Sequence, residues 1–220
     1  MHIHMQQMRH NKRCTVNNQD MQISISRGNS KLGSIPSVSL PAGDTCRSDC
    51  ECGIKCYAKK IERLRPSVRA AYKKNYELLK SDPDTYWREV EASVMMSRFF
   101  RFHVSGDIVD EDYLKKMIEI ADRNRHCEIL CFTKRYDIVN RCLDSGVFAP
   151  QNLHLVFSAW RNLRMENPYH LPVAHVRYRD GTTTASAAAI QCRGNCTECA
   201  TTDGGCWSLQ NGQEVVFDEH

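Results

Sequence analysis

Apolar and polar positions alternate with two different periods along the middle of this chain. Short, mostly apolar runs at residues 99–104, 128–133 and 152–157 are separated by segments whose apolar residues recur every three to four positions, at residues 110–125 and 136–144. The short runs predict buried strands, and the longer period predicts amphipathic helices. Strands that alternate with helices of this length predict βαβ units and a mostly parallel sheet.

Similar patterns predict elements on both sides of this central block. Before it we expect two short strands and three helices, at residues 22–26, 37–41, 57–64, 66–80 and 82–98. Asp82 is the expected N-cap of the third helix, with Pro83 in its first turn. After the block we expect a strand near residues 173–178, a small and polar segment at residues 181–189, and a last strand at residues 213–217.

The length and composition favour one α/β domain. A chain of 220 residues with 41% apolar content can bury one good core. We expect a mobile N-terminal segment at residues 1–21, then a single domain at residues 22–220 with a cysteine-rich extension at about residues 190–210. No apolar run approaches the length that spans a bilayer, and the start lacks a cleavage pattern, so we expect a cytoplasmic protein without a membrane partner.

Twelve cysteines add a chemical expectation, because eight of them fall into two groups at opposite ends of the chain. The two groups are Cys46, Cys50, Cys52 and Cys56, and Cys192, Cys196, Cys199 and Cys206. Four thiolates fill one metal or iron–sulfur site, and cysteines this close in sequence seldom form good disulfides. Each group therefore predicts a metal-binding loop, and all eight cysteines are candidate ligands.

The identity of the metal is less constrained than the ligand set. A Cys-x-Cys spacing without paired Cys-x-x-Cys knuckles is atypical of zinc ribbons, so iron–sulfur is favoured and zinc is the alternative. Two 4Fe–4S clusters and one larger shared cluster both remain open. In a reducing compartment the other four cysteines are expected to be buried or incidental thiols: Cys14, Cys127, Cys131 and Cys142.

Polar residues follow three expected strands of the central block. They are His103, Ser105 and Asp107, then Thr133 and Lys134, then Ser158 and Trp160. The carboxyl ends of parallel strands meet at one edge, where the first cysteine loop also lies, so these side chains and the thiolates should share one face. As candidate catalytic residues we take His103, Ser105, Asp107 and Lys134, and as candidate cofactor contacts Thr133 and Ser158. Taken one at a time, these residues have structural explanations that are at least as good: Asp107 as the cap of a turn, His103 as a buried histidine bonded to the backbone, and Lys134 as a surface lysine.

Positive charge is concentrated in one stretch, although the formal net charge is only +4. From Lys55 to Lys80 there are nine Lys or Arg against Glu62 and Glu77. Such a surface can attract an acidic protein or a nucleic acid. A solvated helix face is the simpler explanation.

Several motifs together resemble the phage gene product 88 family. They are GNSKLG at residues 28–33, SLP at 39–41, the first cysteine group through Ala58, HVSGD at 103–107, FTK at 132–134, and Cys196, Cys199, Cys206 and Trp207. The resemblance implies a phage or prophage source, and therefore the cytoplasm of a phage-infected or prophage-carrying bacterium. It implies little biochemistry.

The opening order of strand, cysteine loop, helix and strand ending in Ser105-Gly106-Asp107 is more distantly similar to radical S-adenosylmethionine enzymes. That resemblance implies a partial, open β/α barrel, a 4Fe–4S cluster, and S-adenosylmethionine whose methionine amino group the turn at Gly106 would bind. The cysteine gaps depart from the usual three and two residues, because this loop has gaps of three, one and three. A fourth thiolate would close the iron that the cosubstrate needs.

Two classes of function follow from these observations. The polar strand ends favour a redox or radical enzyme that receives electrons from a donor such as ferredoxin or flavodoxin, and we lean towards it. Full cysteine ligation favours a non-catalytic electron-transfer or structural protein, and zinc would favour a nucleic-acid-associated one.

Overall fold

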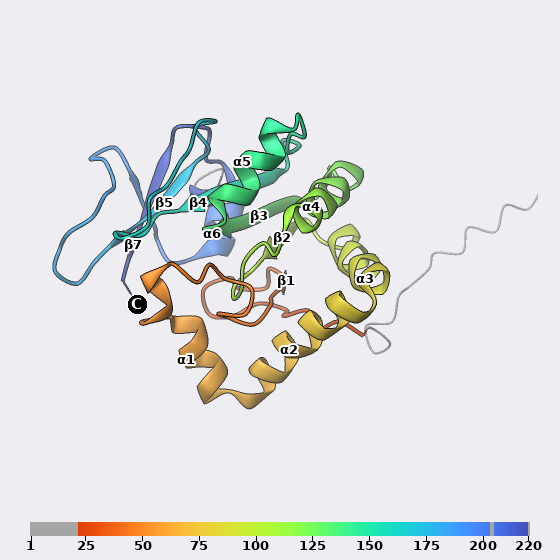
Figure 1. The fold of residues 1–220 in the computed structure, drawn as a ribbon. Helices are drawn as coiled ribbons and strands as arrows, with labels where there is room; N and C mark the ends of the chain where they lie inside the picture. The colour runs from red at the N-terminus through yellow and green to blue at the C-terminus, as the bar shows by residue number, and fades with distance from the viewer. Residues whose placement is uncertain (1–21, 203–204, 220) are drawn as a thin grey trace, which may run out of the picture.

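The computed structural model describes residues 22–202 and 205–219 (Figure 1). The segment at residues 1–21, where mobility is expected and where Cys14 lies, falls outside the described residues. Seven strands form one sheet in the order β1-β2-β3-β4-β5-β7-β6, and every neighbouring pair in it is parallel. The strands are β1 (Ser37–Val38), β2 (Phe99–Phe102), β3 (Glu128–Thr133), β4 (Leu153–Ser158), β5 (Val173–Arg177), β6 (Ile190–Gln191) and β7 (Glu214–Asp218).

The described residues also form six α-helices and two short 3-10 helices. They are α1 (Tyr57–Leu64), α2 (Pro66–Ser81), α3 (Pro83–Met95), α4 (Glu111–Arg123), α5 (Tyr136–Asp144), α6 (Cys196–Thr201), η1 (Glu51–Gly53) and η2 (Gly205–Trp207). Asp82 caps α3 as expected, because its side chain accepts a hydrogen bond of 3.0 Å from the Thr85 backbone N–H. Within the described chain, no helix is both long enough and apolar enough to cross a membrane.

The two faces of the sheet are covered differently. Phe102, Cys131 and Leu155 are aligned neighbours on β2, β3 and β4, and they belong to the larger core, which the apolar stripes of α3, α4 and α5 complete. On the other face, Phe132 is aligned with Val156, and a smaller core forms with residues of the second cysteine segment. Helices α3, α4 and α5 therefore close one face, and the chain around the second cysteine group, with α6, covers the other.

Most of the expected elements are confirmed to within a few residues, and the sheet is parallel throughout. The strand expected at residues 22–26 is wrong, since only Ser26 makes an isolated antiparallel bridge, to Ser37. Two short elements of the C-terminal cysteine segment, β6 and α6, were not predicted. Among the described strands, β1 pairs only with β2 and β6 only with β7, so these strands form an open sheet with β1 and β6 at its two edges.

Candidate metal centre and the cavity beside it

Both cysteine groups line one cavity of about 280 Å³ on the face of the sheet away from the large core. Strand residues Arg101, Phe132, Val176 and Phe217 form part of its wall. The eight cysteines named as candidate ligands come from opposite ends of the chain, and all eight are in this lining. The sheet thus brings two sequence-distant sets of sulfur atoms to one space.

The first group lies on a tight loop that leads into a helix. Cys50 precedes η1, Cys52 lies within it, and Cys56 is the N-cap of α1. The Sγ atoms of Cys50 and Cys52 are 2.9 Å apart, and the hydrogen bond between them lowers the pKa of Cys50 to about 6 while it raises the pKa of Cys52. Burial raises the pKa of Cys46, and negative charge at Cys56 adds to this effect. Within this pair, Cys50 is therefore the thiol that ionises more readily.

The second group is held together by a short helix and a glycine. Cys196 and Cys199 are three residues apart on α6, so they project from the same side of it. Gly205 has φ +67°, and a Cβ at that position would lie 2.8 Å from the Cys199 Sγ, so only glycine lets η2 and Cys206 approach this closely. Burial raises the pKa of Cys206 to about 12, with further contributions from charge on Cys192, Cys196 and Cys199. A bound cation would relieve this mutual repulsion.

The GNSKLG motif supports the second group. Asn29 Oδ1 accepts hydrogen bonds of 2.9 Å from the backbone N–H groups of Lys31 and Leu32, which shapes a turn. The carbonyl groups of those two residues then accept from the Cys196 backbone N–H, at 2.9 Å, and from Thr197 Oγ1, at 3.0 Å. Residues 28–33 are therefore a platform for α6, a role that the sequence did not reveal.

The donor chemistry fits a thiophilic centre, although the sulfur atoms do not form a compact ion site. In the part of the chain that the structure describes, no three His, Cys, Asp or Glu side chains are gathered closely enough to hold a metal ion. The cysteines there are free thiols, and each group supplies four sulfur donors of the kind that iron–sulfur clusters and zinc prefer. The assignment of the eight as ligands stays a prediction. Cys127, Cys131 and Cys142 are buried away from these groups, as expected.

The Ser105-Gly106-Asp107 turn lies against the start of the first cysteine loop. The Ser105 carbonyl accepts from the Leu40 backbone N–H at 3.1 Å, and the Asp107 backbone N–H donates to Thr45 Oγ1 at 3.2 Å. Gly106 has φ +81°, and a Cβ there would lie 2.8 Å from the Leu40 Cβ. Ser105 Oγ also donates to Glu62 Oε1 of α1 at 2.9 Å. These contacts tie the end of β2 to the cysteine loop.

The Asp107 carboxylate is fully engaged within the protein. It accepts from Thr133 Oγ1 at 2.6 Å, from the Lys134 backbone N–H at 2.9 Å, and from the Ile108 backbone N–H at 2.8 Å. Burial raises the pKa of this carboxyl, and the three donors oppose the rise. Asp107 and Thr133, a candidate catalytic residue and a candidate cofactor contact, therefore join the ends of β2 and β3 to each other.

His103 is also satisfied by protein partners. It is 4% exposed, its Nε2 lies 3.0 Å from the Tyr113 hydroxyl, and its Nδ1 lies 3.7 Å from the Cys131 Sγ. Burial lowers the pKa of His103 to about 3, so the ring is neutral at ordinary pH. This environment makes His103 a poor proton donor, although it contributes to the cavity wall.

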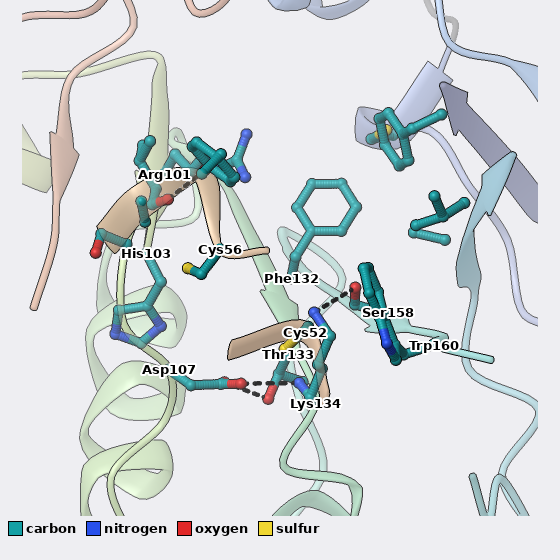
Figure 2. Close-up of a pocket in the computed structure, with 18 of the residues that line it drawn as sticks. Cys52, Cys56, Arg101, His103, Asp107, Phe132, Thr133, Lys134, Ser158 and Trp160 are labelled. Atoms are coloured by element: carbon teal, nitrogen blue, oxygen red, sulfur yellow. Dashed lines mark hydrogen bonds between the residues drawn. The ribbon is translucent and has the colours of Figure 1, made fainter. Parts of the chain in front are cut away.

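Lys134 and Ser158 present polar atoms to the cavity. Lys134 Nζ donates to Ser158 Oγ at 3.1 Å and lies 5.9 Å from the centroid of a Trp160 ring. Figure 2 shows these three side chains together at the ends of β3 and β4, with Cys52 beside Lys134. The expected convergence of polar strand ends and thiols is therefore present. Within it, Lys134 is only half-buried, whereas His103 and Asp107 are buried.

Arg101 is a cavity residue that the sequence analysis missed. Its guanidinium lies 4.9 Å from the centroid of the Phe132 ring (Figure 2), and its Nε is buried without a hydrogen-bond partner. None of the ion pairs among the described residues involves Arg101 or Lys134. An arginine inside an otherwise aromatic strand was the available signal, because burying such a charge requires a compensating anion.

Comparison with known proteins agrees with the sequence motifs. No curated protein matches the chain, and no solved structure matches it. A family profile described as gene product 88 matches residues 8–205, which include both cysteine groups except Cys206. Because that match covers most of the sequence, the chain belongs to the gene product 88 family.

Proposed function

We propose that this protein is an iron–sulfur redox enzyme whose clusters face a substrate cavity. The observation that carries the proposal is the position of the cysteines, since two groups of four thiols, distant in sequence, line the same cavity. A structural metal site is normally closed within its own loop and has no need of a shared space. The cavity that both cysteine groups line has a volume of about 280 Å³, which is close to that of small-molecule sites.

The charges around the cavity support a reaction there. An iron–sulfur centre with four thiolate ligands is anionic, so the unpaired cations of Arg101 and Lys134 would lower the cost of bringing that charge into a partly apolar space. When bound, such a centre supplies single electrons. Lys134 Nζ would orient an anionic or carbonyl-bearing substrate by hydrogen bonding, with Ser158 as a second polar contact.

A radical S-adenosylmethionine-like layout is the more specific form of this proposal. Strands β1 to β5 are adjacent in sequence order, as in a partial β/α barrel, and the first cysteine loop follows β1. The turn at Gly106 is hydrogen-bonded to the beginning of that loop, which is the proximity that a cosubstrate bridging the cluster and the turn would require. Three of the four cysteines would then hold the cluster and leave one iron open.

A non-catalytic role is the second candidate, and one observation favours it. His103, Ser105 and Asp107 are all buried and engaged with protein partners, so three of the four candidate catalytic side chains have a structural role. In that case both centres would be fully ligated, and they would carry electrons or join the two ends of the chain. Zinc in both groups would serve the structural role alone.

Anaerobic purification with iron, sulfide and zinc analysis separates these possibilities. We expect iron with matching sulfide, and an electron paramagnetic resonance signal in the reduced protein that changes when S-adenosylmethionine is added. An unchanged signal would favour the closed, non-catalytic centre. Stoichiometric zinc without sulfide would refute the iron–sulfur proposal.

Three cysteine variants test which sulfur atoms bind the metal. We expect Cys52→Ser and Cys199→Ser each to lose roughly half of the iron, because each removes a ligand from one group and cluster binding is coupled to folding. Cys142→Ser is the matched control, since Cys142 is buried in α5 outside the cavity lining. Equal iron content in all three variants would remove Cys52 and Cys199 from the ligand set.

A further inference from the structure

Helices α1 and α2 carry an unusual number of unpaired positive charges. Six cationic residues on these helices, and Arg65 between them, are exposed and make no ion pair with any described residue: Lys59, Lys60, Arg63, Arg65, Arg69, Lys73 and Lys74. On other helices, such as α4, exposed lysines have nearby carboxylates, for example Lys116 with Glu119 at 2.8 Å. The α1–α2 surface therefore has a positive potential that the protein itself does not neutralise.

Large apolar side chains are exposed on the same surface. Ile54 is 81% exposed, Leu64 is 61% exposed and Ile61 is 37% exposed. Ile61 and Leu64 are three residues apart on α1 and so lie on one side of the helix. An apolar centre with charged residues around it is the usual composition of a protein–protein interface. Nucleic-acid interfaces are more polar, so this combination favours a protein partner.

This surface adjoins the first cysteine group. Helix α1 begins directly after Cys56, and Ile54 lies between Cys52 and Cys56 in the loop. Figure 1 shows α1 and α2 along one side of the molecule, well away from α4 and α5. A partner bound to α1 would therefore touch the chain segment that carries the first set of thiols.

We propose that the α1–α2 surface docks a small acidic electron-transfer protein of the ferredoxin or flavodoxin type. This inference rests on the proposed iron–sulfur function. One electron passes from the reduced partner, which is oxidised, to the centre held by the first cysteine group, which is reduced. Redox encounters are typically small and transient, and complementary charge raises their association rate more than their affinity.

The test measures how fast the oxidised, iron-loaded protein is reduced in an anaerobic stopped-flow experiment. Reduced ferredoxin is the protein donor, and dithionite is a small donor that needs no docking surface. We expect Lys60→Glu combined with Arg63→Glu to slow reduction by ferredoxin on the order of tenfold and to weaken its dependence on salt. The rate with dithionite should not change.

A matched control carries the same change of charge elsewhere. Lys115→Glu combined with Lys116→Glu reverses two exposed charges on α4, where surface ion pairs contribute little to stability. If ferredoxin reduces the two double variants at the same rate, the docking proposal is overturned. An unchanged dithionite rate in the same samples would show that the cluster itself is intact. A protein that dithionite cannot reduce would overturn the proposed function and this inference together. Binding of each variant to duplex DNA is measured alongside. If Lys60→Glu combined with Arg63→Glu keeps its ferredoxin rate but loses DNA binding, the docking proposal is overturned and the partner of the surface is a nucleic acid.

Discussion

Replacing Gly106 with alanine tests the turn that joins β2 to the first cysteine loop. At φ +81°, a Cβ would lie 2.7 Å from Thr45 Oγ1 and 2.8 Å from the Leu40 Cβ. The left-handed backbone conformation costs an L-residue about 1–2 kcal/mol, and overpacking adds about 1–3 kcal/mol. We therefore expect Gly106→Ala to lower the free energy of unfolding by about 2–5 kcal/mol.

Gly181→Ala is the matched control for this substitution. Gly181 also has φ +81°, but no heavy atom lies within 4 Å of the position of its Cβ. Its alanine variant should therefore lose only the conformational part, about 1–2 kcal/mol. The difference between the two variants isolates the crowding against Leu40 and Thr45.

Chemical denaturation followed by circular dichroism measures both losses, and iron analysis of the same samples measures the effect on the cysteine loop. Because Thr45 directly precedes Cys46, and Leu40 begins the segment that leads to it, displacing them should also lower the iron content of Gly106→Ala. Gly181→Ala should keep its iron. Equal losses of stability in the two variants would refute the claim that the turn is closely packed on the loop.

Three further predictions concern single side chains with buried polar atoms. Between pH 6.5 and about 3 the unfolded chain protonates His103 and the folded protein does not, so stability should fall by up to about 1.4 kcal/mol per pH unit as the pH is lowered. His103→Asn should flatten that slope in urea titrations; an unchanged slope would contradict the assignment. Asn152 Nδ2 donates to three backbone carbonyls, so Asn152→Asp should lower the denaturation midpoint further than Asn152→Ala, and the reverse order would contradict the contacts. Metal-free Arg101→Met should be at least as stable as the parent, because a buried guanidinium Nε without a hydrogen-bond partner is removed; a loss above about 1 kcal/mol would show that the contacts of the guanidinium with the Phe132 ring and the Cys196 thiol outweigh that cost.

Local signals were sufficient for most of the fold. The six-residue run at residues 128–133 predicted β3 with its exact bounds, and Asp82 followed by proline predicted the start of α3. The alternation at residues 22–26 was misleading. There, the Ile23 backbone N–H donates to Glu89 Oε2 at 2.8 Å and the Ser24 backbone N–H donates to Asn75 Oδ1 at 2.6 Å. Side chains from two helices accept the backbone hydrogen bonds that a neighbouring strand would otherwise accept. No local sequence pattern predicts such long-range contacts.

The candidate site, like the fold, was predictable only in part. Its location was predictable, because parallel strands place their carboxyl ends at one edge whatever their sequence. The state of each side chain was not predictable. Asp107 is engaged because Thr133 and the Lys134 backbone lie at the end of the adjacent strand, and Arg101 forms no ion pair because no carboxylate of the described residues reaches it. Those facts depend on non-local register, which sequence spacing does not encode.

The position of β7 has a consequence for how the chain reaches this state. Strand β7 follows β6 in sequence but lies between β5 and β6, and β6 pairs with no other described strand. On a ribosome, the second cysteine group emerges before the strand that anchors it to the sheet. Parallel pairing of this kind forms late, because its loop-closure cost comes before its contacts. Cys192 can therefore take its final place only once β7 has inserted, because its backbone N–H donates to the Val216 carbonyl at 2.9 Å, so a metal centre in the second group would be completed late in folding.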